Sequence, residues 1–138
     1  MRKLLTAVSL AVLAGLLLAA VTSYYIGSDE RSQVKATALK YFLAWEECNP
    51  AGMYIYISTR DQSNCKLNEY IDKFQEYQLR PVRHEVLEIT VRKNTARLKA
   101  RLYWPDITSG GELPREESFF LTRENDGWKI MEDASLSD

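Results

Sequence analysis

The pattern of apolar and polar positions divides the chain into three stretches with different periods. Residues 4–20 read LLTAVSLAVLAGLLLAA, an apolar block without a charged side chain. From Glu30 to about Tyr77, apolar side chains recur at steps of three and four, which is typical of amphipathic helices. After Pro81 the period changes to two, which indicates β-strands. Helices followed by a run of antiparallel strands predict an α+β domain in which one helical layer covers a curved antiparallel sheet.

The helical stretch divides at polar and turn-forming residues. Asn49-Pro50 interrupts the first helix, and Asn before Pro is a favourable start for the next one. Gly27-Ser28-Asp29 is a short polar joint before the first helix, and the sequence STRDQSN at 58–64 is interpreted as a loop. The expected helices cover residues 30–48, 53–57 and 68–77.

The strands are expected in two hairpins, joined by the loop PDITSGGELP at 105–114. Lys93-Asn94 lies between the first two strands, and Asn tolerates the left-handed conformation that a tight turn requires. This turn sets Arg92 opposite Thr95, Glu88 opposite Lys99 and Ile89 opposite Leu98, so charges face charges and apolar residues face each other. Asn125-Asp126-Gly127 is a second turn signal. The expected strands cover residues 84–92, 95–104, 116–123 and 128–132.

Charge at the N-terminus predicts how the chain is oriented in a membrane. Arg2 and Lys3 precede the apolar block, and the first acid is Asp29. Positive charge before an apolar stretch holds the N-terminus in the cytoplasm and sends the remainder across the membrane.

The apolar block has two interpretations, a retained anchor or a cleaved signal peptide. Residues 4–26 have the length of a membrane-spanning helix, and Tyr24-Tyr25 fall where interfacial aromatic residues gather. The prediction is therefore a single-pass membrane protein in which residues 1–27 form a signal-anchor and residues 28–138 an extracytoplasmic domain. The alternative is cleavage near Ser23, which would leave a secreted or periplasmic protein.

Composition limits the partners and the redox chemistry. Without residues 1–27, which carry two bases and no acids, 16 Lys and Arg face 19 Asp and Glu, a net charge of −3. Such a mild balance, without a long basic run, gives no indication of nucleic-acid binding. Cys48 and Cys65 both lie in the exported part, where an even count predicts a disulfide. The alternative is a pair of buried free thiols.

Several phrases resemble nuclear-transport-factor-2-like domains. They are the helix ending YFLAWEECNPAGMYIYIS, a third helix, a charged hairpin and the closing DGWKI, and together they span Val34 to Glu132. The chain is most similar in style to small exported versions in bacterial cell envelopes, which stand behind one hydrophobic segment or precede penicillin-binding transpeptidase domains. The resemblance implies a cone-like half-barrel of helices on a curved sheet, open at one end. Enzymes of that superfamily, such as ketosteroid isomerases and polyketide cyclases, use Asp or His inside the cone.

Candidate ligand-binding residues follow from the alternation of the strands. Glu85 shares the inward parity of Leu87, as do Arg83 and Trp104, so these three side chains and Trp45 are candidates for the lining of the cone. Glu85 near Arg83 is either a ligand contact or a satisfied ion pair. His84, the single histidine, has the opposite parity and is expected at the surface or the strand end. The aromatic residues could line a pocket, although their spacing is typical of core packing.

A second candidate site is a basic stripe on the outer face of the sheet. Arg92, Arg97, Lys99 and Arg101 could contact anionic head groups, cell-wall polymers or a partner protein. Solvation of an ordinary charged sheet face is the alternative.

Other chemistry is not indicated by the sequence. There is no G-x-S-x-G or H-E-x-x-H motif, and one histidine with two cysteines makes a poor metal site. No catalytic residue, metal or cofactor is predicted. The expected function is a non-enzymatic, membrane-anchored accessory domain that binds an envelope protein or a small ligand. The alternatives are a small isomerase or dehydratase and a carrier of an apolar ligand; the sequence leaves the oligomeric state open.

Overall fold

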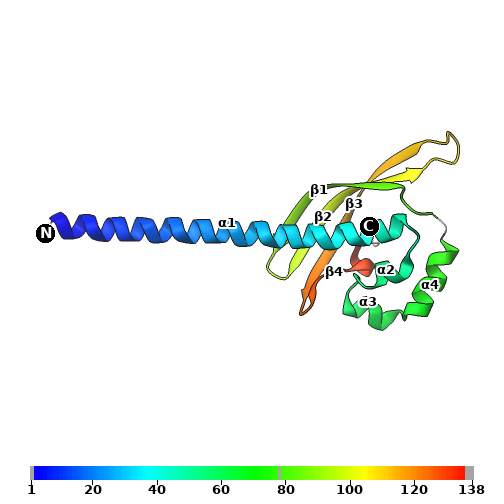
Figure 1. The fold of residues 1–138 in the computed structure, drawn as a ribbon, viewed down its shortest axis with the longest axis horizontal. Helices are drawn as coiled ribbons and strands as arrows, with labels where there is room; N and C mark the ends of the chain where they lie inside the picture. Colours follow the sequence, from blue (N-terminus) through cyan, green and yellow to red (C-terminus); the bar gives the residue numbers. More distant parts are fainter. Residues whose placement is uncertain (1, 78, 136–138) are drawn as a thin grey trace. The chain divides into compact units, whose positions relative to one another are not determined.

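The computed structural model describes residues 2–77 and 79–135. Helices and strands follow in the predicted order, with α2, α3 and α4 in an arc that leads from the end of α1 back to the sheet (Figure 1). The α+β class predicted from the sequence is confirmed. The elements are α1 Arg2–Glu46, α2 Pro50–Tyr54, α3 Thr59–Asn64, α4 Leu67–Glu76, β1 Arg83–Arg92, β2 Thr95–Pro105, β3 Glu112–Glu124, β4 Gly127–Ile130 and α5 Glu132–Ser135.

The strands form one antiparallel sheet in the order β1-β2-β3-β4. The predicted pairing of Arg92 with Thr95 and of Glu88 with Lys99 is confirmed. Between Val86 and Glu88 the register shifts by one residue, because Leu87 forms a bulge in β1. A bulge adds a residue to one strand only, so the side chains of β1 before Leu87 face the opposite way from the alternation that holds after it.

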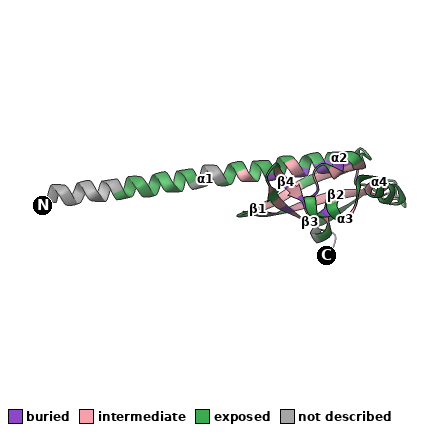
Figure 2. Cartoon of the chain, turned by 90° about the horizontal axis from the view of Figure 1, so that it is seen from below, coloured by how far each residue is buried: buried purple, intermediate pink, exposed green. Residues whose placement is uncertain are grey.

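The core of the domain lies between the sheet and the helices. Buried residues follow one face of α1 and the inner face of the sheet, as the purple segments of Figure 2 show. Phe42 of α1 packs edge-on against Phe119 of β3, with 4.8 Å between ring centroids. Leu98 and Leu102 of β2 are also fully buried. These side chains belong to one hydrophobic core between α1 and the sheet.

Two predicted boundaries in the helical stretch are wrong. Gly27-Ser28-Asp29, expected as a joint, is helical and forms part of α1. A single Gly costs only about 1 kcal/mol inside a helix, and no Pro is present to end it. The stretch 58–64, expected as a loop, contains α3, which begins after Ser58 because the Ser58 hydroxyl accepts a hydrogen bond from the backbone N–H of Asp61. The prediction that Asn49 caps a helix with Pro50 in its first turn is confirmed.

The β1–β2 turn holds Lys93, rather than the expected Asn94, in the left-handed region, with φ of 53°. A residue with a Cβ is strained by about 1–2 kcal/mol in this conformation. Lys93→Gly is therefore expected to raise the free energy of unfolding by about 0.5 kcal/mol, after the extra chain entropy of Gly is subtracted. Urea unfolding of the full chain in detergent measures this value, and Asn94→Gly is the matched control. An increase for Asn94→Gly but not for Lys93→Gly would contradict the assignment.

Two compact units divide after Glu30. The first unit contains apolar residues whose side chains are exposed, among them Val12, Leu16 and Leu18. Their helix is long and apolar enough to cross a membrane, a property that signal sequences share. The side chains of residues 4–11 and 23–26, which the predicted span includes, lie outside the described residues.

Candidate functional site

A half-buried carboxylate and two tyrosines join three helices at the inner side of the domain. Tyr41 of α1 and Tyr70 of α4 both donate hydrogen bonds to Oε1 of Glu132, at 2.5 Å and 2.6 Å. Glu132 opens α5, directly after the last strand. The Tyr41–Tyr70–Glu132 cluster therefore ties the C-terminal end of the described chain to α1 and α4.

Asp61 of α3 holds the backbone of Glu132 in place. Its Oδ2 accepts hydrogen bonds from the backbone N–H of Glu132, at 3.0 Å, and from the Ser58 hydroxyl, at 2.7 Å. Asp61 is buried, and the two donors compensate the loss of its hydration. These hydrogen bonds set the position of Glu132 beneath the two tyrosines.

Burial dominates the electrostatics of the cluster. It raises the pKa of Glu132 above the usual range, with smaller contributions from the charges of Asp61 and Asp133, while the two tyrosine hydroxyls act in the opposite direction. Burial and the nearby Glu132 also raise the pKa values of Tyr41 and Tyr70 well above the usual value. The tyrosines are therefore neutral donors at any physiological pH.

His84 lies at the strand end, as expected, but its side chain points into the domain rather than to the surface. Its Nδ1 contacts Oε1 of Glu46 at the end of α1, and only 18% of the His84 side chain and 14% of the Glu46 side chain are exposed. The imidazole ring also lies 5.2 Å from the ring of Phe42. The bulge at Leu87 explains the difference, because it turns the first residues of β1 to the other face.

The same bulge places Glu85 and Arg83 on the outer face, so the inward orientation expected for them is wrong. Their side chains are 51% and 55% exposed. Arg83 pairs with Glu112 at 2.8 Å and stacks over the ring of Tyr103. Glu85 pairs with Arg101 at 3.2 Å. The structure does not bring these two side chains to the inner face that carries Trp45 and Trp104.

Trp45 and Trp104, by contrast, meet on the inner side of the sheet. Their rings pack edge to face with centroids 5.5 Å apart, and Trp45 also contacts the ring of Tyr41. The Nε1 of Trp104 is buried and has no hydrogen-bond partner among the described residues. A buried donor without an acceptor costs about 1–3 kcal/mol, so this N–H is an exception that calls for an explanation.

Glu117 is a second polar group on the inner face. It lies opposite the buried Ala100 in the β2–β3 register. Burial raises its pKa, and the charge of Arg115 opposes the shift. Sequence reasoning missed Glu117 and the Tyr41–Tyr70–Glu132 cluster, although the alternation of β3 around Phe119 carries the signal that Glu117 faces inward.

The basic stripe on the outer face divides into two halves. Lys99 and Arg101 both pair with Glu116, at 2.7 Å and 2.8 Å. Arg97 donates to the Ser118 hydroxyl, and the side chain of Arg92 makes no ion pair within the described part of the chain. The end of the stripe at the β1–β2 turn therefore keeps its positive charge.

Cys48 and Cys65 are free thiols, so the predicted disulfide is absent. Cys48 is exposed in the left-handed conformation just after α1, whereas Cys65 lies between α3 and α4 with its Sγ near the Lys66 carbonyl. Neither thiol is buried, in contrast to the alternative expectation. Across residues 2–77 and 79–135, no group of three or more His, Cys, Asp and Glu is arranged to hold a metal ion.

No family model matches the sequence, and no curated protein matches it either. Solved structures do share its architecture. A SEC-C motif containing protein from Psychrobacter arcticus superposes with a TM-score of 0.60 at 10% identity, over 79% of this chain and 64% of that one. A ketosteroid isomerase-like protein from Erwinia carotovora atroseptica gives 0.52 at 14% identity, over 73% and 90%.

A third structure, a candidate dehydratase of the nuclear-transport-factor-2-like family from Streptomyces avermitilis, gives a TM-score of 0.51 at 13% identity, over 75% and 92% of the two chains. At these identities the similarity shows the fold alone. The fold that the resemblance implied is confirmed, and the chain spans less than two thirds of the first of these relatives.

Proposed function

We propose that this chain, whose domain has the nuclear-transport-factor-2-like fold, is a non-enzymatic binding domain anchored in a membrane by residues 4–26. Its domain is an extracytoplasmic accessory of the cell envelope and binds a small ligand or a segment of a partner protein beside Trp45 and Trp104. The observation that carries the proposal is the buried indole N–H of Trp104, which lacks an acceptor within the described residues.

The chemistry of the Trp45–Trp104 pair limits the ligand. Two indole rings supply a broad apolar wall, and each ring is only partly buried against the core. An acceptor atom on a ligand would relieve the cost of the unsatisfied Trp104 donor, which makes binding more favourable. The expected ligand therefore has an apolar body and one hydrogen-bond acceptor, such as a carbonyl oxygen.

The titratable groups support binding rather than catalysis. A general base must reach a proton on the substrate. The Oε1 of Glu132 already accepts two tyrosine hydroxyls, Asp61 accepts two donors, and Nδ1 of His84 is engaged by Glu46. Each group has the satisfied partners of a structural buried polar residue.

The apolar helix supports the membrane location. Exposed Leu and Val side chains along residues 12–21 have no protein surface to cover them within the first unit. A helix that is apolar on every side is stable in hydrocarbon rather than in water. Arg2 and Lys3 before it favour a cytoplasmic N-terminus, which places the domain on the other side.

Trp104→Phe tests the proposal, because it keeps an aromatic ring against Trp45 and removes the N–H together with part of the indole. We expect the free energy of unfolding to stay within about 1 kcal/mol of the wild type, since the loss of an unsatisfied donor offsets the loss of part of the ring. Native mass spectrometry of the full chain, extracted from its membrane in mild detergent, is expected to show a ligand adduct on the wild type that Trp104→Phe loses.

Tyr77→Phe is the matched control, because it removes a hydroxyl from an exposed ring. It should retain the adduct. An adduct that persists in Trp104→Phe would show that the indole N–H does not bind the ligand and would refute the proposed site.

A further inference from the structure

We propose that a hollow between Arg92 and Arg97 binds the phosphate head groups of anionic lipids in the membrane that anchors the chain. The hollow, called here the Arg92–Arg97 hollow, has a volume of about 500 Å³. Its polar lining comes from these two arginines, Thr90 and Thr95, and its apolar lining includes Phe120 and Met131. The inference rests on the membrane anchor of the proposed function and names the partner of one half of the basic stripe.

Charge pairing distinguishes this hollow from the remainder of the outer sheet face. Lys99 and Arg101 are neutralised by Glu116 and Glu85, as is usual on a solvated sheet surface. Arg97 has only a neutral partner, the Ser118 hydroxyl at 3.0 Å, and Arg92 has no side-chain partner within the described residues. Two guanidinium groups without a carboxylate at one hollow form a site complementary to an anion.

The lining groups match the chemistry of a phosphate ester. A guanidinium group binds phosphate through two parallel N–H donors, which an ammonium group does not offer. The hydroxyls of Thr90 and Thr95 can donate further hydrogen bonds. Phe120 and Met131 offer apolar contact to the glycerol and upper acyl carbons of a lipid, which a free inorganic ion would not use.

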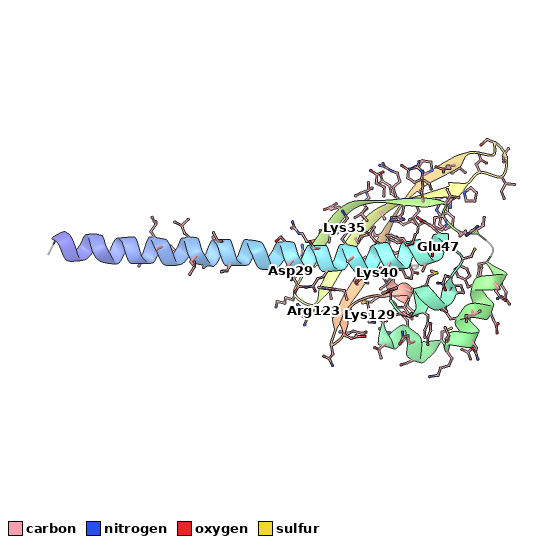
Figure 3. All side chains as sticks on the ribbon, viewed as in Figure 1. Asp29, Lys35, Lys40, Glu47, Arg123 and Lys129 are labelled. Atoms are coloured by element: carbon pink, nitrogen blue, oxygen red, sulfur yellow. The ribbon has the colours of Figure 1, made fainter. Side chains whose placement is uncertain are left out.

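The position of the hollow in the domain favours a lipid as the source of the phosphate. Residues 31–46 of α1 belong to the domain unit, and the β1–β2 turn lies at the end of the domain where this segment begins (Figures 1 and 2). Lys35 of α1 and Arg123 of β3 carry further positive charge at this end (Figure 3). Glu88 is an acidic residue next to the Arg92–Arg97 hollow, and it lines a smaller hollow together with Arg97 and Lys99.

The length of the connecting chain limits how far this end can be from the bilayer. Four residues lie between Ile26, the end of the predicted span, and Arg31, the first residue of the domain unit, so five Cα–Cα steps join them. Even a fully extended chain of that length reaches only about 18 Å. So short a connection permits the arginines to come within about 8 Å of the lipid phosphates, the range over which anionic lipids attract them at physiological salt.

The test uses the full chain, ¹⁵N-labelled and reconstituted in lipid nanodiscs of phosphatidylcholine, with or without phosphatidylglycerol. The Nε–Hε signals of arginine side chains report directly on guanidinium contacts. We expect the signals of Arg92 and Arg97 to shift in the anionic discs and to return on addition of salt, while the signal of Arg101, paired with Glu116, stays in place. Equal shifts at all three arginines, or none, would overturn the inference.

Two further arms identify the source of the anion and the residues responsible. Inorganic phosphate added to phosphatidylcholine discs should shift Arg92 and Arg97 far less; shifts of the same size would assign the hollow to a soluble anion instead. Arg92→Gln with Arg97→Gln should lower the phosphatidylglycerol retained after detergent extraction by about threefold or more. The matched pair Lys73→Gln with Arg115→Gln, which changes the same charge elsewhere, should retain it.

Failure of this inference can be told apart from failure of the proposed function. A chain that is released from membranes by high salt or alkaline carbonate has no anchor, which refutes the proposed function itself. If the chain stays in the membrane and the Nε–Hε signals of Arg92 and Arg97 are the same in neutral and anionic nanodiscs, only the lipid site is refuted.

Discussion

Glu132→Ala is expected to lower the free energy of unfolding by about 3 kcal/mol. The substitution removes the acceptor that Tyr41 and Tyr70 share, and both hydroxyls lie where water has little access. Each buried donor left without an acceptor costs about 1–3 kcal/mol. Urea unfolding of the full chain in detergent, followed by tryptophan fluorescence, measures the change, because all three tryptophans lie in the domain.

Glu132→Gln separates the role of the charge from the role of the hydrogen bonds. The amide keeps an acceptor oxygen for the tyrosines, so stability should stay within about 1 kcal/mol of the wild type. Asp133→Ala, at an exposed neighbour, should be nearly neutral. If Glu132→Gln destabilises as much as Glu132→Ala, the tyrosine hydrogen bonds are not the cause.

The difference in stability between the wild type and Glu132→Gln is also expected to depend on pH. Burial raises the folded-state pKa of Glu132 above its ordinary value of 4.5. Between these two pKa values the folded state binds more protons than the unfolded state, so the contribution of Glu132 to stability is complete below pH 4.5 and is lost as the pH rises. The wild type should therefore lose stability relative to Glu132→Gln as the pH rises above 4.5, and a gain would contradict the raised pKa.

Phe42→Ala is expected to cost about 4 kcal/mol, the largest single effect in the core. Phe42 is fully buried and packs against Phe119 of β3 and the ring of His84 in β1. Its removal leaves a cavity between α1 and the sheet that neighbouring rings fill only in part. Leu43→Ala is the matched control on the same helix, since that side chain is 50% exposed. Its cost should stay below about 1 kcal/mol, and the same unfolding measurement compares the two.

The fold was largely predictable because its periodicity is local. Steps of three and four along Val34, Ala38 and Phe42 and the alternation along β2 reflect burial on one face, and that burial is what the structure shows. The hairpin register near Lys93-Asn94 followed from setting charged residues opposite charged residues and apolar residues opposite apolar residues. Short elements were missed where a cap, rather than periodicity, starts them, as with Ser58 before α3.

The candidate site was much less predictable, because it depends on contacts between distant residues. Glu132 stands 62 positions from Tyr70 and 91 from Tyr41, so no window of sequence contains the cluster. The inward assignment of Glu85 failed for a different reason, since a single bulge reverses alternation while leaving composition unchanged. Trp45 and Trp104 were placed together because each lies at the end of a long, regular element.

The bulge at Leu87 also bears on how the strand tolerates insertions and deletions. Loss of Leu87 would restore regular pairing along the whole of β1 without turning its first four residues over, because Val86 already pairs with Ala100 and Glu88 with Lys99. His84 would stay on the inner face and the charged Glu85 on the outer face, so the strand would lose one side chain and keep the chemistry of both faces. Sequences of this fold that lack the bulged residue are thus expected to show an unbroken alternation along β1 and the same residue types in their interiors.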